Sequence, residues 1–238
     1  KQIIKTMKKY LNKLSLVVML VTSSLMLSAC SDTTQSSVKL NAKASNSQNH
    51  QKINSAADTV IITEAKFRFS EIEFESATDN DSIDIEQGPL VLSLNVNGGL
   101  TEVGIANVSA GFYEELEFEI EARDEDDALV KDPDFEGENG QNYSMVISGT
   151  INGEPFTFRS EKDFEVELEF EPAFEVNDEE QVSITLNFDT SLWFLDQDGN
   201  ALNPSDSNNI LLIESNIENS IEAFEDDNED GEDDEDED

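Results

Sequence analysis

Apolar and acidic residues alternate strictly in three segments of the chain. Residues 71–75, 115–121 and 163–171 carry Glu or Asp at every second position, with Ile, Leu, Val or Phe between them. A period of two is that of a β-strand with one buried face. Glutamate is a poor strand former, so strand propensity does not account for its repeated use. The pattern predicts three half-buried strands, each with a row of carboxylates on its outer face.

The first of these segments extends a longer run of strand-like residues from Val60. Phe67 and Phe69 occupy odd positions, whereas Ile72 and Phe74 occupy even ones. Because a slip of one residue turns every side chain to the opposite face, this change of phase predicts a β-bulge at residues 70–71.

Four further runs have the composition of strands. Asn152 and Gly153 lie between two of them and predict a hairpin with a type I′ turn. The runs cover residues 88–95, 143–151, 154–159 and 182–188. Together with the alternating segments they predict a mainly β fold, a single antiparallel β-sandwich.

One segment near the C-terminus has the period of a helix. Isoleucines and a phenylalanine recur at spacings of three and four, which predicts an amphipathic helix over about 206–224, capped by Asp206 or Ser207 and packed on the sandwich. These residues are Ile210, Ile213, Ile217, Ile221 and Phe224. The sandwich and helix would span 58–224, and the very acidic residues 225–238 predict a disordered tail.

The N-terminal residues resemble the signal of bacterial lipoproteins. Lysines follow Met7, an apolar run covers 14–27, and the run ends in Leu-Ser-Ala before Cys30. The resemblance implies that residues 1–30 are a signal peptide starting at Met7 and that Cys30 is lipidated. With Ser31 after the cysteine, it also implies a lipid-anchored protein of the bacterial cell envelope, at the outer membrane. An ordinary secretory signal or a membrane anchor are the alternatives.

Residues 31–57 are small and polar and predict a flexible tether between this anchor and the domain. Further along, residues 105–120 combine a strand, the corner Ala110-Gly111-Phe112-Tyr113 and an alternating strand. This order resembles uncharacterised bacterial surface lipoproteins with transthyretin-like or starch-binding-like β-sandwiches. The resemblance implies the fold rather than an activity.

The net charge of −40 is unevenly distributed. Of the 54 acidic residues only Asp32 precedes residue 58, whereas eight of the 14 basic residues do. Such a surface repels nucleic acid and attracts divalent cations or basic proteins. Adaptation to a salty milieu is the alternative explanation.

The inventory of reactive side chains is short. Cys30 is the only cysteine and His50, in the predicted tether, the only histidine. The folded part therefore has no Ser-His-Asp, Cys-His or histidine-metal centre. Carboxylates remain, which suit hard cations such as Ca²⁺. Paired carboxylates also occur in glycosidases, but no pair stands out by its spacing, and we expect no enzymatic activity.

Two acidic segments resemble calcium-binding loops in their spacing. The first matches D-x-N-x-D-G-x₅-E and would use Asp226, Asn228, Asp230 and Glu237. In so acidic a tract the match is almost forced, and loose cation condensation is the alternative. The second would use Asp196, Asp198 and Asn200, for which a simple turn is the alternative.

Two further hypotheses concern surfaces. Trp193, Tyr113 and Tyr143 could stack on a glycan, unless they pack in the core. The three carboxylate rows could lie on non-adjacent strands facing Lys66, Arg68 or Arg159, or they could hold cations between them. The alternative is that they form only a solvated face. The predicted function is a non-enzymatic binding or adhesion module, with a structural protein that docks a basic partner, or a carbohydrate-binding module, as alternatives.

Overall fold

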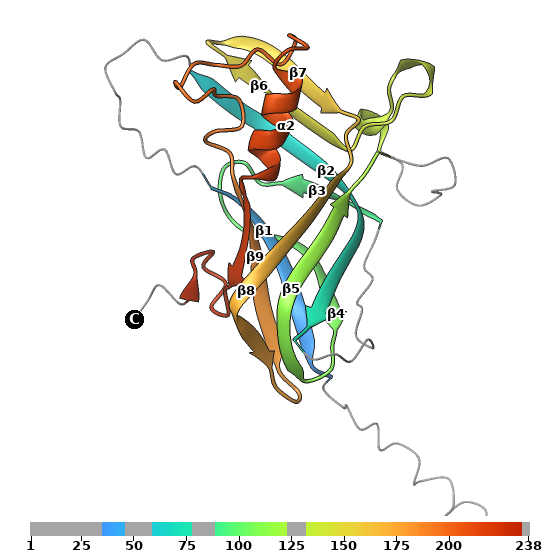
Figure 1. Cartoon of the computed structure of the whole chain (residues 1–238), viewed down its shortest axis with the longest axis vertical. Helices are drawn as coiled ribbons and strands as arrows, with labels where there is room; N and C mark the ends of the chain where they lie inside the picture. Colours follow the sequence, from blue (N-terminus) through green and yellow to red (C-terminus); the bar gives the residue numbers. More distant parts are fainter. Residues whose placement is uncertain (1–34, 46–58, 78–88, 123–131, 235–238) are drawn as a thin grey trace, which may run out of the picture. The chain divides into compact units, whose positions relative to one another are not determined.

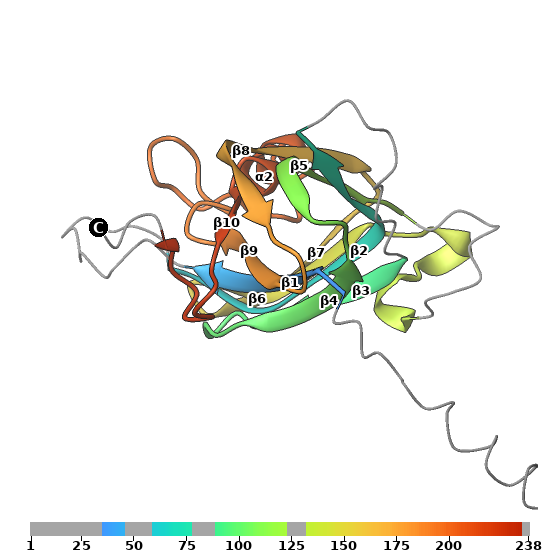
Figure 2. The ribbon, with the colours of Figure 1, turned by 90° about the horizontal axis from the view of Figure 1, so that it is seen from below.

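Two β-sheets packed face to face form the protein. The computed structural model describes residues 35–45, 59–77, 89–122 and 132–234 (Figure 1). The first sheet has the order β10-β9-β1-β4 and the second β7-β6-β2-β5-β8, with β3 also paired to β2. Figure 2 shows β8 and β5 on one side of the molecule and β9, β1 and β4 on the other. The predicted mainly β sandwich is confirmed.

The strands of the first sheet are β1 (Ser37–Ser45), β4 (Thr101–Asn107), β9 (Gln181–Asp189) and β10 (Ile221–Glu225). Those of the second are β2 (Val60–Ser76), β3 (Leu90–Leu94), β5 (Gly111–Ile120), β6 (Met145–Ile151), β7 (Glu154–Ser160) and β8 (Phe164–Val176). The helical elements of the described residues are α2 (Ile210–Glu218) and the short 3₁₀ turns Pro133–Phe135 and Glu138–Gly140.

Alternating apolar side chains of the two sheets meet in the core. Phe67 of β2 and Phe188 of β9 come from opposite sheets, and their ring centroids lie 5.1 Å apart. The register of β2 against β5 shifts between Phe69 and Glu71. This irregularity turns both Phe69 and Ile72 into the core, with 0 and 2 % exposure, and confirms the predicted bulge.

The β6–β7 hairpin is also confirmed. Ile151 pairs with Glu154, and the two residues between them, Asn152 and Gly153, have φ angles of 53° and 86°. Both central residues of a type I′ turn require a positive φ, which glycine and asparagine adopt most readily.

The prediction of a flexible tether over 31–57 is wrong for its middle part. Ser37–Ser45 forms β1, which lies between β9 and β4 and runs parallel to β9, whereas the other described strand pairs are antiparallel. Val38, Leu40 and Ala42 are at most 3 % exposed. Their alternation with polar residues is a strand pattern that small side chains make hard to recognise. The predicted signal peptide and Cys30 lie outside the described residues.

The predicted C-terminal helix is too long. Helix α2 ends at Glu218, and Ile221 and Phe224 instead belong to β10, which pairs with β9. The helix is preceded by Asn209, while Asp206 accepts a hydrogen bond from the backbone N–H of Asn208 in the turn before it. Isoleucine is β-branched and suits a strand as well as a helix, so its spacing alone could not locate this boundary.

The predicted disordered tail is wrong for residues 225–234. Glu225 is the last residue of β10, and the segment that follows lies on the first sheet, with Asp226 fully buried. The physical reason is that two lysines of β1 and a threonine of β9 offer partners to this segment, which a count of its charges does not reveal. Residues 235–238 lie outside the described part.

Candidate functional site

The three carboxylate rows lie on neighbouring strands and are aligned with one another. Strand β5 lies between β2 and β8, and each glutamate of its row has a glutamate directly across on both sides. We call these nine residues the carboxylate grid; its rows are Glu71–Glu119–Glu165, Glu73–Glu117–Glu167 and Glu75–Glu115–Glu169. The predicted alternative of non-adjacent strands is therefore wrong.

The opposite face of the same strands accounts for this arrangement. Ile72, Phe74, Leu116, Phe118 and Val166 are at most 7 % exposed and belong to the core. Because side chains alternate along a strand, burying this apolar set turns every intervening glutamate outward. Core packing thus sets the register that brings like charges opposite one another.

Burial and neighbouring charges act on two glutamates of the central column, Glu115 and Glu117. Burial, followed by the charges of Glu75 and Glu167, raises the pKa of Glu115. Burial, followed by the charges of Glu165 and Glu167, raises the pKa of Glu117. Both carboxyl groups therefore hold a proton to a higher pH than a free glutamate does.

A simple estimate gives the size of the repulsion. Directly opposed side chains lie about 5 Å apart, where two unit charges in water repel by about 0.8 kcal/mol. The six direct pairs of the grid thus cost about 5 kcal/mol without salt and roughly half of that at physiological ionic strength. This is a considerable fraction of the stability of an ordinary domain, about 5–15 kcal/mol.

The cations expected to face the rows have other partners. The Nζ of Lys66 lies 2.5 Å from Asp134 and 3.2 Å from Asp132. The guanidinium of Arg68 lies 4.9 Å from the ring centroid of Phe135. The guanidinium of Arg159 lies 5.7 Å from the ring centroid of Tyr143.

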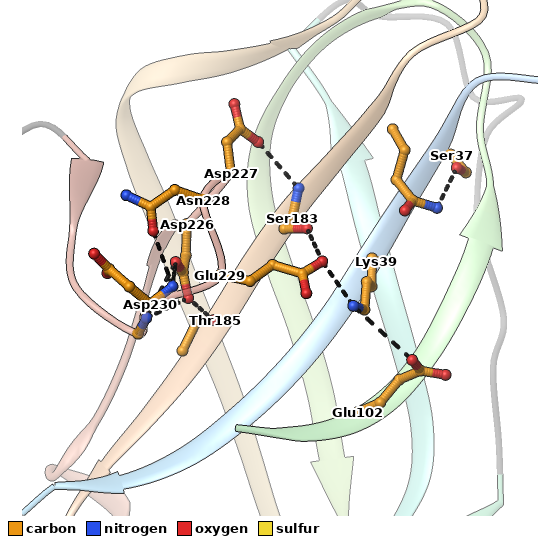
Figure 3. A network of polar contacts seen from close by, with 12 residues as sticks. Ser37, Lys39, Glu102, Ser183, Thr185, Asp226, Asp227, Asn228, Glu229 and Asp230 are labelled. Carbon is orange, nitrogen blue, oxygen red and sulfur yellow. Dashed lines mark hydrogen bonds and ion pairs between the residues drawn. The ribbon is translucent and has the colours of Figure 1, made fainter. Parts of the chain in front are cut away.

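Residues 226–234, here called the C-terminal loop, form a second acidic feature (Figure 3). Asp226 is 0 % exposed, and its Oδ2 accepts a hydrogen bond of 2.7 Å from the hydroxyl of Thr185 on β9. Its Oδ1 accepts from the backbone N–H groups of Asp230 at 2.9 Å and Gly231 at 3.2 Å. Gly231 has a φ of 81°, which permits the tight return of the chain. The buried carboxylate thus organises the loop around itself.

Two lysines of β1 hold this loop on the sheet. The Nζ of Lys39 lies 2.7 Å from Glu229 and 4.0 Å from Glu102 on β4, as Figure 3 shows. The Nζ of Lys43 donates a hydrogen bond to the carbonyl of Gly231. The bond to Lys39 lowers the pKa of Glu229, and the bond to Glu229 raises the pKa of Lys39.

Three of the predicted calcium ligands, Asp226, Asn228 and Asp230, lie in the C-terminal loop, where their side chains accept hydrogen bonds. Asn228 and Asp230 each accept a backbone N–H two residues further on, from Asp230 and Glu232. Glu237, the predicted fourth ligand, lies outside the described residues. Within the described ranges, no three or more Asp, Glu, His or Cys side chains are grouped so as to hold a metal ion. Calcium binding by this loop stays a prediction.

The second predicted calcium segment forms a turn. The Oδ1 of Asp196 accepts hydrogen bonds from the backbone N–H groups of Asp198 and Asn200, and its Oδ2 accepts from the amide of Asn200. The bonds from Asn200, above all that of its side chain, lower the pKa of Asp196. Gly199 has a φ of 79°. These contacts account for the segment without an ion.

Two of the three predicted stacking residues are core residues. Trp193 and Tyr113 are both 0 % exposed. The indole N–H of Trp193 donates to Ser220, and the hydroxyl of Tyr113 donates to the carbonyl of Ser109. A sugar cannot reach these rings, so the predicted glycan platform is wrong for them. Tyr143 is partly exposed but lies against Arg159.

No protein family, curated protein or solved structure matches the chain. In the part of the chain that the structure describes, no helix has the length and apolar character needed to cross a membrane.

Proposed function

We propose that the chain is a non-enzymatic binding module of the bacterial cell envelope, anchored by a lipid at Cys30, and that the carboxylate grid recruits divalent cations. The observation that carries the proposal is the direct pairing of glutamates across three adjacent strands. Paired carboxylates repel one another in salt-free water, whereas a divalent cation between them turns the same spacing into an attraction.

Calcium suits this surface better than transition metals do. It prefers oxygen ligands, tolerates irregular geometry and accepts water among its six to eight ligands. Two opposed glutamates would supply two to four oxygens, and water the rest. Such open sites bind weakly, so we expect occupancy at millimolar calcium, as extracellular modules show.

The C-terminal loop is the second element of the proposal. Asp226, Asn228 and Asp230 keep the spacing of calcium ligands, and Gly231 has the backbone conformation that this spacing requires. The loop is held on the sheet by Lys39 and Lys43. Cation binding there would further stabilise a loop whose conformation is already fixed by these contacts.

Thermal unfolding tests the cation hypothesis. The melting temperature is measured with millimolar CaCl₂ and with NaCl at the same ionic strength. We expect a higher melting temperature in calcium, because a ligand that binds only the folded state stabilises it. Equal melting temperatures would contradict the proposal, since general screening acts in both buffers.

A basic protein partner is the second candidate. It is favoured because, among the described residues, no three or more acidic side chains are grouped so as to hold a metal ion, whereas an extended array of charges suits an extended cationic surface. A pull-down from envelope extract that returns one cationic protein, unaffected by chelator, would support it. The carbohydrate alternative has lost two of its three predicted stacking residues, because Trp193 and Tyr113 are buried in the core.

A further inference from the structure

The start of the domain is fixed to one end of the sandwich. Ser36 lies directly before β1 and is 7 % exposed. Its hydroxyl donates to the carbonyl of Asn177 at 2.9 Å and accepts from the backbone N–H of Glu179 at 3.1 Å. The backbone N–H of Ser37 donates to the carbonyl of Glu180 at 2.9 Å. The chain thus enters the domain against the turn between β8 and β9.

A second turn contacts the same serine from the other side. The backbone N–H of Val108 donates to the carbonyl of Ser36 at 2.9 Å. Val108 belongs to the turn between β4 and β5. We call residues 107–112 and 175–180, which form these two turns, the N-terminal pole of the sandwich.

The length of chain before Ser36 limits how far this pole can lie from a lipid anchor. Five residues lie between Cys30 and Ser36, and the six Cα–Cα steps that join the two residues span at most about 22 Å. Residues 36–45 of the expected tether are not available as a spacer, because Ser36 and β1 are part of the fold. We infer that the N-terminal pole faces the lipid surface. This inference rests on the proposed anchor at Cys30.

The surface chemistry of the pole specifies the lipid. Phe112 is 48 % exposed and pairs across the strands with Glu175. Asp178, Glu179 and Glu180 are exposed beside it. An exposed apolar ring can insert at the boundary between headgroups and acyl chains, whereas four carboxylates repel anionic lipids. Zwitterionic headgroups are thus the surface that this pole fits.

The opposite end of the sandwich provides an internal control. The backbone N–H of Ala77, after β2, donates to the carbonyl of Phe112 at the N-terminal pole. At the other end of β2, the backbone N–H of Asn152 donates to the carbonyl of Thr59. Strand β2 has 17 residues, so the two ends lie about 50 Å apart along it.

Energy transfer to the membrane tests the inference on the full chain. Ala110→Cys at the pole and Glu154→Cys at the opposite end each receive a donor dye; both sites are exposed. Cys30 does not react if it carries the lipid. The proteins are purified from the bacterial envelope and placed in phosphatidylcholine vesicles that contain an acceptor-labelled lipid. The mass of the mature N-terminus is measured first by mass spectrometry, which shows independently whether the protein is lipidated.

The outcomes separate the two claims. We expect severalfold greater energy transfer from position 110 than from position 154, and loss of most of this difference when a long Gly/Ser linker is inserted after Asp32. Equal transfer from the two positions of a lipidated protein would overturn the orientation alone. A mature chain without lipid would overturn the proposed anchor and the orientation with it.

Discussion

Replacing Glu117 with glutamine removes the central charge of the carboxylate grid. Glu117 lies directly across from Glu73 on β2 and from Glu167 on β8. Each contact repels by about 0.8 kcal/mol in water at 5 Å, and screening at physiological ionic strength lowers this to roughly half. Glu117→Gln is therefore expected to stabilise the fold by about 1 kcal/mol at neutral pH.

The stability gained by Glu117→Gln should depend on pH, which a simple change in packing would not. Burial and neighbouring carboxylates raise the pKa of Glu117 in the folded state. The folded protein then binds a proton more tightly than the unfolded chain, so stability falls as the pH rises above about 4.3, the usual glutamate value, and through the folded pKa. The gain from Glu117→Gln should be absent below this window and complete at pH 7.

Urea denaturation at pH 4 and pH 7, at low and high NaCl, measures the effect. The gain should be largest at pH 7 and low salt and should shrink as salt is added. Glu154→Gln is the matched control, because Glu154 is exposed on β7, outside the grid, and its change should stay within about 0.5 kcal/mol. A variant no more stable than the native protein at pH 7, or a gain independent of salt, would refute the electrostatic reasoning.

Three further substitutions test other parts of the structure. Lys39→Met removes the ion pair with Glu229 and should speed hydrogen exchange in the C-terminal loop. This ion pair lowers the pKa of Glu229 in the native protein. The protection of the loop in the native protein should therefore be complete above the usual glutamate pKa and be lost as the pH falls through the lower pKa of the folded state. Trp193→Phe loses volume and the bond to Ser220 and should destabilise by about 1–3 kcal/mol in urea denaturation. Ser160→Ala leaves the buried Glu214 carboxylate of α2 without its hydroxyl donor and should cost about 1–3 kcal/mol in the same assay.

Each of these has a control in the chain. Lys162→Met removes a lysine paired with Glu218 and should leave exchange in the C-terminal loop unchanged. Phe112→Leu alters an aromatic ring that is 48 % exposed, and Ser148→Ala removes a surface hydroxyl; both should have small effects on stability. Loop exchange that is equally fast in both lysine variants, or unfolding midpoints of the core variants equal to their controls, would contradict the assigned contacts.

The alternating pattern predicted the strands well because core burial alone determines it. The bulge after Phe69 and the hairpin at Asn152 have local causes, a change of phase and a turn that needs positive φ, and both were recognisable in the sequence. The adjacency of the carboxylate rows was not, because the order of strands in a sheet depends on contacts distant in sequence. The same reason explains β1, which pairs with β9 about 140 residues later.

The candidate site was predicted in composition but not in arrangement. Charge alone predicts that residues 225–234 repel one another, yet Lys39 and Lys43 and the hydroxyl of Thr185 hold the segment on the sheet. The sequence signal for these partners was the pair of lysines four residues apart in β1, but β1 lies far from residues 225–234 in the sequence. Trp193 and Tyr113 illustrate the converse: large aromatic rings suit a binding platform, but here the core takes them.

Equilibrium dialysis with calcium tests the central claim most directly. The native chain is compared with a variant in which the middle row, Glu73, Glu117 and Glu167, is changed to glutamine, and with a control that changes Glu154, Glu175 and Glu179 instead. The two variants have the same net charge, so general attraction of cations is equal in both. We expect the middle-row variant to bind less calcium than the control at millimolar concentration, because both have lost three charges but only the middle-row variant has lost glutamates of the carboxylate grid. Equal binding by the two variants would contradict cation recruitment by the grid.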